Sequence, residues 1–516
     1  MRESASERFL VLPARSPSAA DRILAALGGS VRDGMALSVM LVASFAVSAV
    51  LVATDGNMFA GAALLGAIVV LCLTLYRIEW GLYLFVGFVL TFDQFDIPGF
   101  DPITLKVAYF HNLKEIPYLP SIGAAVLNPL ECQLLLLLLV WFVVTFMRKH
   151  SRLTRVPGWG AALVFFFGVV AFLIYGLRQG GEFLPALWEV RALFYFGILY
   201  FFVPQIIKKK EDVRAFFWVC TTAIAFKAFQ ADYRFVRMGF STRGLATLTN
   251  HEDPLFILSL VVFLFGLVLF EARSKQKWAL IALLLPFVIA FYVGQRRAAY
   301  AAIVPMMLVL VMLLPQKQRW MLVKNGFVIF IVVVLYAVVF WDSESRIASP
   351  LKLIKTGLGN DRETAGERYY SNLYREYEKY NLAVTAQTSP IIGIGFGNKY
   401  EEPMKLANIP FPLRDYIPHN EVLWLIVKTG AVGFTLFWFF LNSFACNGGR
   451  VVMNLRDPYL RAVVVVAVAA VIGQIVVSYY DLQLTYYRNM VYLGAMMGLV
   501  PAVESIEKRE AHDKQR

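Results

Sequence analysis

The sequence predicts an all-α polytopic membrane protein. Hydrophobic residues make up 59% of the 516 positions and charged residues only 16%, a balance typical of neither soluble nor disordered chains. Apolar stretches of about 20 residues, each long enough to cross a bilayer as a helix, recur along the chain. Lys and Arg residues lie in clusters between these stretches, as they do at the cytoplasmic ends of membrane spans. The net charge of +13 is therefore attributed to membrane topology, and we expect no nucleic-acid partner.

The apolar stretches give about 12 to 14 expected transmembrane helices. Polar or prolyl residues bound each stretch, and no repeat of longer period or separate cytosolic domain is visible. The fourteen stretches lie near 35–53, 57–76, 79–95, 129–147, 159–177, 189–207, 213–231, 254–271, 277–293, 298–315, 321–341, 419–442, 459–478 and 486–503.

One alternating path places every basic cluster on the same side of the membrane. With the N-terminus inside, the cytoplasmic clusters are 148–155, 208–214, 273–277, 317–324, 450–461 and 508–516. The expected organisation is a cytoplasmic segment without a cleavable signal peptide, eleven spans, one large outer segment, three spans and a cytoplasmic tail. The corresponding ranges are 1–34, 35–341, 342–418, 419–503 and 504–516.

The stretch from 389 to 433 holds the strongest candidate for chemistry. Pro390 and the glycines of the sequence GIGFG allow tight turns and close backbone approach. His419 and Asn420 then open the next apolar helix, directly after Pro418. An imidazole at the membrane edge can exchange a proton near neutral pH. A helix-capping Asn beside an interfacial His explains the same pattern, so both interpretations are open.

Several arginines lie on the side of the membrane where cations are not expected. Arg296 and Arg297 form a short outer turn, and we expect their guanidinium groups to bind a diphosphate. Arg191 either binds a ligand or forms a salt bridge with Glu189. Arg243 lies in another outer loop, and Arg234 and Arg237 are expected to anchor lipid.

Acidic residues in the outer loops are expected to be structural. Glu252 and Asp253 follow His251 and precede Pro254, which favours helix capping over metal binding. Asp93, Asp96 and Asp101 have no firm metal-ligand spacing and are interpreted as loop polarity, and the four cysteines have no paired spacing. We expect no metal and no cofactor. In the outer segment, tyrosines 370, 374, 377 and 380 recur at helical spacing, as either an interfacial stripe or a platform for sugar rings.

Two motifs resemble the O-antigen ligase and polymerase superfamily of bacterial membrane glycosyltransferases. One runs from Pro390 to Gly433, with its glycine turn, His-Asn pair and TGAVG segment. The other is GQRRA at 294–298. The resemblance implies a GT-C-type membrane fold in the inner membrane, with its active site facing the periplasm. It implies a metal-independent, inverting transfer from an undecaprenyl-diphosphate-linked glycan to an acceptor hydroxyl.

On this resemblance His419, Arg296 and Arg297 are the expected catalytic residues. Arg191, Arg243, Asn420, Arg368 and Tyr370 are the expected substrate-binding residues. Polymerisation of O-antigen, capsule or exopolysaccharide units comes first among the reactions, with a chain-length regulator and membrane lipids as further partners. Ligation to lipid A-core or to a protein hydroxyl is the alternative, because the chain has about two more spans than the usual ligase. A transporter of an anionic substrate is the alternative of another class.

Overall fold

The computed structural model describes residues 31–96, 102–116, 126–147, 153–240, 247–343, 348, 351, 369–409 and 411–513. The chain divides into two compact units, which are described separately. Unit 1 comprises 1–76 and 113–126, and unit 2 comprises 77–112 and 127–516. Within the described residues the secondary structure is helical, with no β-strand, and this confirms the predicted all-α fold.

Unit 1 contains two apolar helices joined by a short turn. They are α2 (Val31–Ala53) and α3 (Met58–Tyr76). The Asn57 side chain accepts a hydrogen bond from the amide of Phe59 at 3.0 Å and so begins α3. A short 3-10 helix, η1 (Leu113–Glu115), belongs to the same unit.

Unit 2 contains the remaining helices, and its candidate site is built from the ends of several of them. They are α4 (Ile78–Thr91), α5 (Ile103–Lys106), α6 (Pro129–Met147), α7 (Trp159–Arg178), α8 (Phe183–Ile206), α9 (Lys210–Arg237), α10 (Asp253–Leu269), α11 (Lys275–Ala282), α12 (Leu284–Val293), α13 (Arg297–Leu313), α14 (Gln316–Phe340), α17 (Tyr369–Thr388), α18 (Glu421–Asn454), α19 (Pro458–Tyr480) and α20 (Tyr487–Asp513).

Each of the fourteen predicted spans coincides with a helix or a bent helix pair, but not all of these meet the criteria for a complete crossing. Among the described residues, eight helices are long and apolar enough to span a membrane, or nine if the pair α11 and α12, bent by 48°, forms one span. Four further apolar helices, those ending at Ala53, Thr91, Leu269 and Leu313, are shorter. The chain is thus a multi-pass membrane protein.

The centre of unit 2 is formed by α8, α10, α19 and α20. Their side chains are almost entirely buried, including most of the Val and Ala residues between Ala462 and Val471. A helix that is apolar on all sides is expected to be surrounded by other helices or by lipid. For α8, α10, α19 and α20, other parts of the protein cover much of the helix surface.

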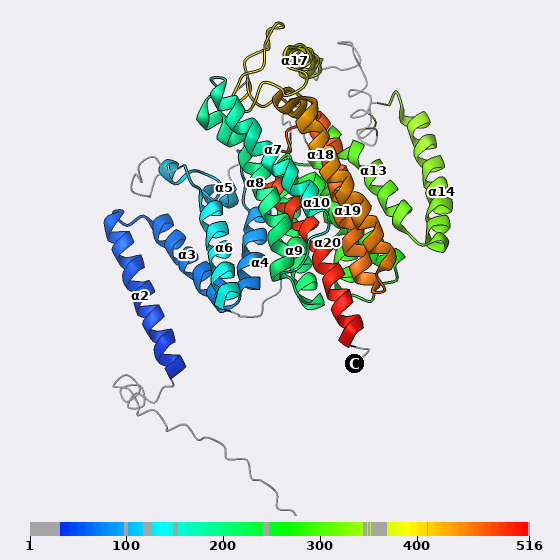
Figure 1. Ribbon diagram of the computed structural model, residues 1–516. Helices are drawn as coiled ribbons and strands as arrows, with labels where there is room; N and C mark the ends of the chain where they lie inside the picture. The colour runs from blue at the N-terminus through cyan, green and yellow to red at the C-terminus, as the bar shows by residue number, and fades with distance from the viewer. Residues whose placement is uncertain are drawn as a thin grey trace, which may run out of the picture. The chain divides into compact units, whose positions relative to one another are not determined.

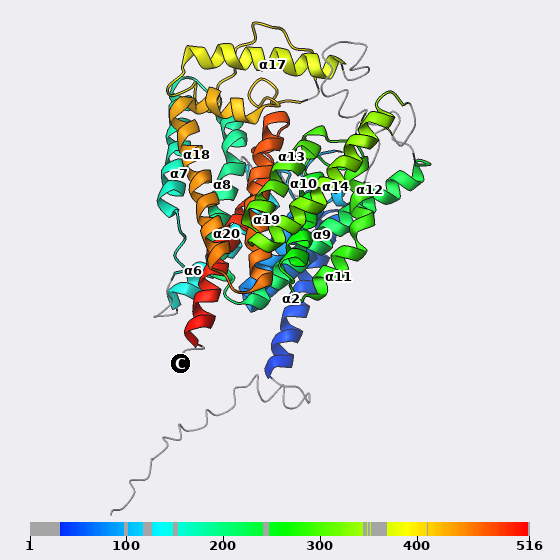
Figure 2. The same ribbon diagram turned by 90° about the vertical axis from the view of Figure 1, so that its right-hand side faces the viewer.

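Different elements lie at the two ends of unit 2. Helix α17 lies across the end at which α18 begins (Figures 1 and 2), and we call this the His419 end. The chain terminus lies at the opposite end, beyond α20, which we call the C-terminal end. The loops after α9, α12 and α19 also reach the His419 end.

Candidate active site

His419 lies beside a buried carboxylate at the His419 end. Its Nδ1 is 3.1 Å from Glu378 Oε1, and its backbone amide donates to Glu378 Oε2 at 2.9 Å. The Glu378 side chain is 2% exposed, whereas the imidazole is 24% exposed. A carboxylate at Nδ1 selects the tautomer that carries its proton there and leaves Nε2 as an acceptor. Glu378 comes from the buried face of α17, so this helix orients the imidazole.

His251 forms a second pair of the same kind. Its Nδ1 is 3.1 Å from Asp481 Oδ2, and the Arg296 Nη1 lies 3.6 Å from the same oxygen. Asp481 is 6% exposed and His251 is 32% exposed, so again the carboxylate is covered and the imidazole is open. The ring of Tyr486 packs edge-on against His251 at 5.9 Å. Three loops, after α9, α12 and α19, meet at this pair.

The charges around the second pair favour a neutral imidazole beside an ionised carboxylate. Burial lowers the pKa of His251, Arg296 and the nearby His419 lower it further, and Asp481 raises it. Burial alone would raise the pKa of Asp481, but His251, Arg296 and Arg375 together hold that pKa well below its usual range.

Buried hydrogen bonds and ion pairs hold in place the loops that carry the second pair. Glu421, at the first position of α18, accepts hydrogen bonds from the amides of Gln483, Leu484 and Thr485. Arg488, at the start of α20, contacts Asp253 Oδ1 at 2.8 Å and Glu252 Oε2 at 3.6 Å. Because a buried charge is stable only when it is paired, these contacts hold both loops in one position.

Helix α18 is broken at Gly430, where φ is +60° and ψ is −166°. The glycine-rich loop fills the break: Ile394 and Gly395 donate to the carbonyls of Val427 and Lys428, both at 2.9 Å. Beyond the break, Ala431 and Val432 donate to the carbonyls of Pro390 and Ile391. All four peptide groups next to the break therefore have partners within the protein, as a membrane-embedded irregularity requires. A Cβ on Gly430 would lie 2.3 Å from the carbonyl carbon of Ile391.

Several hydrogen-bond donors at the His419 end are buried and have no acceptor among the described residues. Arg296 Nε, the Tyr374 hydroxyl and Asn420 Nδ2 are among them. Tyr374 packs edge-on against His419 with ring centroids 5.5 Å apart. Burial, followed by the charge of Glu378, raises the pKa of Tyr374 to about 12, so its hydroxyl keeps its proton. Buried donors without partners are expected where a polar ligand binds.

A comparison with protein families identifies the segment that contains most of this site. Residues 258–438 match the family described as O-antigen ligase. This segment, about a third of the chain, is similar to that family. The match confirms the resemblance drawn from the two sequence motifs and supports glycan transfer of the ligase and polymerase type. A search of curated proteins gave no match.

The matched segment contains Arg296, Arg297, Glu378 and His419, whereas His251 precedes it and Asp481 follows it in the chain. The two adjacent arginines have different partners. Arg296 approaches Asp481, while Arg297 donates to Asn372 Oδ1 on α17 at 2.9 Å. One side chain thus joins the second imidazole pair and the other contacts the helix that holds the first.

The other predicted binding residues are dispersed. Asn420 caps α18, because its side chain accepts from the Leu423 amide at 3.0 Å. Tyr370 is 63% exposed at the start of α17, next to Tyr369. Arg191 is buried against Glu131, with its Nε 3.1 Å from Oε1. Arg243 and Arg368 lie outside the described residues.

Three sequence-based interpretations are wrong. Glu189 does not pair with Arg191: it forms a buried ion pair with Lys428 at 2.7 Å and accepts the Gly397 amide at 2.6 Å. Asp93 is not an ordinary polar residue of a surface loop, since it is buried and binds Lys227, Asn250 and Thr104. Arg234 is 4% exposed and so is not an anchor for lipid headgroups.

Sequence reasoning missed the partners that complete the site. The sequence assigns Glu252 and Asp253 to helix capping, whereas in the structure both contact Arg488, and the preceding His251 contacts Asp481. Glu378 and Asp481 were not singled out. The available signal was the presence of ionisable residues at the ends of apolar spans, which must find partners. Within the described residues, no group of three His, Cys, Asp or Glu side chains has the arrangement of a metal site.

Proposed function

We propose that this protein transfers a glycan from an undecaprenyl-diphosphate-linked donor to an acceptor hydroxyl at the periplasmic face of the bacterial inner membrane. The favoured product is a polymer of O-antigen, capsule or exopolysaccharide repeat units. One observation carries the proposal: a segment similar to the O-antigen ligase family brings an imidazole oriented by a buried carboxylate, and a nearby guanidinium, to the same end of the helix bundle.

In the proposed reaction, His419 Nε2 takes the proton of the acceptor hydroxyl as its oxygen attacks the anomeric carbon. The bond between that carbon and the diphosphate oxygen breaks, and the diphosphate leaves with the electron pair. Glu378 stabilises the imidazolium that forms, because it contacts Nδ1. Attack opposite the leaving group inverts the anomeric configuration.

The leaving diphosphate requires positive charge and hydrogen-bond donors, and Arg296 and Arg297 supply both. The unpaired Nε of Arg296 and the unpaired hydroxyl of Tyr374 are donors that a diphosphate or sugar can satisfy. His251 and Asp481 position Arg296 through the shared carboxylate oxygen. In this mechanism the donor contributes its own leaving group, and neither a metal nor a cofactor takes part.

The test is transfer by the full-length protein in liposomes with a lipid-linked repeat unit. His419→Ala should still insert and bind donor, yet transfer glycan about 10²- to 10⁴-fold more slowly, the usual loss for a positioned acid–base group. His111→Ala is the matched control, because His111 is exposed on a loop and forms no part of the site. Wild-type rates in His419→Ala would overturn the assignment of the base.

The products distinguish the two acceptors. A ladder of lengthening lipid-linked chains is expected of a polymerase, whereas a single transfer to lipid A-core or to a protein hydroxyl would establish the ligase alternative. Activity should persist in EDTA. Loss of activity on chelation, with recovery in Mg²⁺ or Mn²⁺, would contradict the metal-free mechanism.

A further inference from the structure

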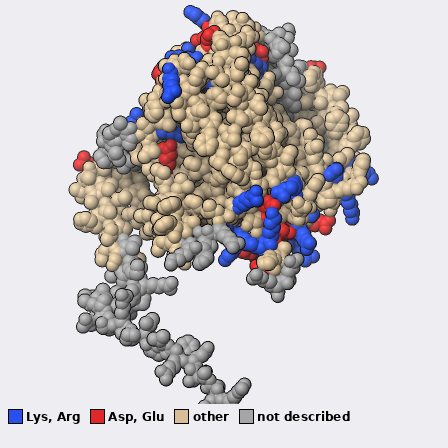
Figure 3. Space-filling view, viewed as in Figure 1, with Lys and Arg blue, Asp and Glu red and all other residues tan. Residues whose placement is uncertain are grey.

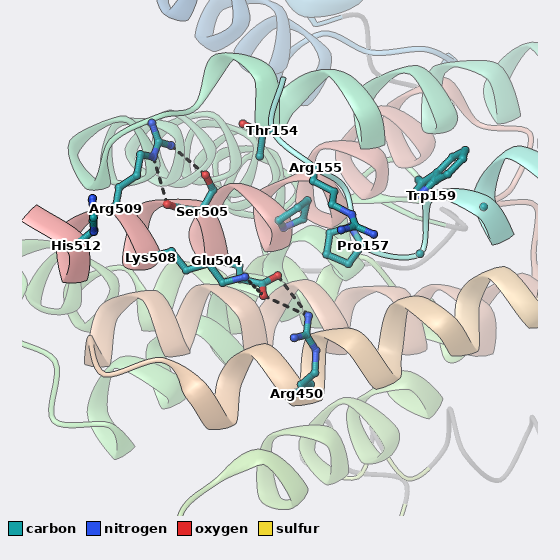
Figure 4. A pocket seen from close by; sticks show the side chains of 13 residues that line it. Thr154, Arg155, Pro157, Trp159, Arg450, Glu504, Ser505, Lys508, Arg509 and His512 are labelled. Atoms are coloured by element: carbon teal, nitrogen blue, oxygen red, sulfur yellow. Dashed lines mark hydrogen bonds and ion pairs between the residues drawn. The ribbon is translucent and has the colours of Figure 1, made fainter. Parts of the chain in front are cut away.

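A cavity of about 800 Å³ lies at the C-terminal end of unit 2, opposite the His419 end. Three segments line it: the approach to α7, one residue of α18 and the last turns of α20 (Figure 4). None of the residues proposed for glycan transfer takes part. The cavity is therefore a separate feature of the molecule.

The lining has more positive than negative charge. Arg155, Arg450, Lys508 and Arg509 face a single carboxylate, Glu504. Figure 3 shows blue side chains gathered over this end of the protein. Because one carboxylate cannot neutralise four cations, the cavity favours an anionic ligand.

Contacts within the protein pair only some of these cations with a carboxylate. Glu504 already accepts from Lys508 at 2.8 Å and from Arg450 at 3.2 Å (Figure 4). Arg509 donates to the carbonyl and hydroxyl oxygens of Ser505, both at 3.2 Å. Arg155 has no carboxylate partner in the described part of the chain. Two guanidinium groups, those of Arg155 and Arg509, thus remain without a counter-charge.

The start of α7 adds backbone donors to the same cavity. Helix α7 begins at Trp159, and its N-cap, Gly158, provides no side-chain hydrogen bond. The first amides of a helix lack intrahelical acceptors and carry the positive end of its dipole, which favours phosphate. Gly160 contributes open space, since a Cβ placed on it would meet no atom within 4 Å.

A further cation, Lys208, lies beside this cavity. Lys208, which follows α8, donates to the Thr154 hydroxyl at 2.6 Å. Burial, and then the positive charge of Arg509, lower the pKa of Lys208 to about 8.

We infer that this cavity binds the phosphate group of an anionic membrane lipid, with Arg155 and Arg509 as its principal cations. The shared chemistry is that of a phosphate ester, and the position of the cavity selects the lipid as its source. All three of its segments adjoin or belong to candidate membrane spans, α7, α18 and α20. Trp159, 52% exposed at the edge of the cavity, belongs to the residue type that favours the membrane interface.

The test measures lipid binding by native mass spectrometry of the full-length protein, with phosphatidylglycerol against phosphatidylcholine. Wild type should retain phosphatidylglycerol preferentially, and the variant Arg155→Ala/Arg509→Ala should bind it roughly thirtyfold more weakly. Arg273→Ala/Lys275→Ala is the charge-matched control, because both residues are exposed near the start of α11, outside the cavity lining.

A second pair of variants occupies the cavity without removing a cation. Gly160→Glu should place a carboxylate among the cations and displace phosphatidylglycerol, whereas Gly160→Gln, of nearly equal size, should displace it much less. Glycan transfer should be unchanged in both. Equal phosphatidylglycerol binding by wild type, the double variant and Gly160→Glu would overturn the inference. Binding of inorganic phosphate without any preference for anionic lipid would overturn the lipid as the source.

Discussion

Two hydrogen bonds join Glu421 to Thr485: the Glu421 Oε1 accepts from the Thr485 amide at 3.1 Å and from its hydroxyl at 2.5 Å. Glu421 lies two residues after His419, and Thr485 lies four residues after Asp481. This contact therefore connects the chain segments that carry the two imidazole pairs. Its removal should affect a site that neither residue enters.

Glu421→Gln should loosen the loop that carries Asp481. Hydrogen bonds to a buried charge contribute about 1.5–3 kcal/mol each, so we expect a lower midpoint of thermal unfolding and slower transfer. Thr485→Val removes only the hydroxyl contact and should have the same effect at a smaller magnitude, about 1 kcal/mol. Thermal unfolding of the purified variants measures both. An unchanged midpoint in Glu421→Gln would show that the loop is held by other contacts.

The pH dependence of His251 should respond to its two neighbours in opposite directions. Asp481 raises the pKa of His251 and Arg296 lowers it. Asp481→Asn should therefore extend the neutral form of His251 to lower pH, and Arg296→Gln should restrict it to higher pH. Diethyl pyrocarbonate modifies the neutral imidazole, so the pH midpoint of modification at His251, followed by peptide mass spectrometry, reports the change.

His512, exposed near the end of α20, is the internal control for that experiment. Its modification midpoint should be the same in all three proteins. Shifts of His251 in one common direction in both variants would contradict the charge arrangement described above.

Gly430→Ala should strongly destabilise the protein. The backbone there has a φ of +60° and an extended ψ that residues with a Cβ rarely adopt, and the added methyl group would overlap Ile391. We expect a loss of at least about 3 kcal/mol in folding free energy, seen as reduced folded protein in the membrane. Gly326→Ala, within α14, meets no atom within 4 Å and has an ordinary helical backbone. That control should express at wild-type levels.

Substitution of Arg296 and of Arg297 should remove different contacts and have the same effect on glycan assembly. Arg296→Ala removes the cation that faces Asp481, and Arg297→Ala removes the contact with Asn372. Each should abolish most glycan assembly at normal protein levels, and Lys should restore little, because an ammonium does not reproduce a planar guanidinium. Cell-surface glycan measured against protein abundance provides the comparison. Full assembly in the double Ala variant would exclude diphosphate binding by this pair.

The sequence was sufficient to predict the helices but not the contacts between their ends. Apolar length alone predicted the positions of fourteen helices or helix pairs, of which eight or nine among the described residues are long and apolar enough to span a membrane. Pro390 with the following glycines predicted a tight loop that the structure contains. The sequence also predicts that Asn420 caps the following helix, as it does. These features depend on residues that are close together in the chain, so the sequence alone is sufficient to predict them.

The pairs that define the candidate site join residues far apart in the chain. His251 and Asp481 are separated by 230 positions, and His419 and Glu378 by 41. Composition indicates that a buried Lys or Glu needs a partner, but not which one, because the choice depends on how the helices pack. The assignment of Glu189 to Arg191 failed for this reason: proximity in sequence was used where only packing decides.

The break in α18 also imposes an order on biogenesis. The peptide groups around Gly430 find their hydrogen-bond partners on residues 390–395, which are synthesised earlier and lie outside the helix. Lipid offers these groups no partners, so a ribosome-bound chain cannot release α18 into the bilayer as an independent, finished span. Residues 390–395 must therefore bind to α18 while this helix enters the membrane. Insertion of α18 is thus coupled to the folding of the segment that precedes it.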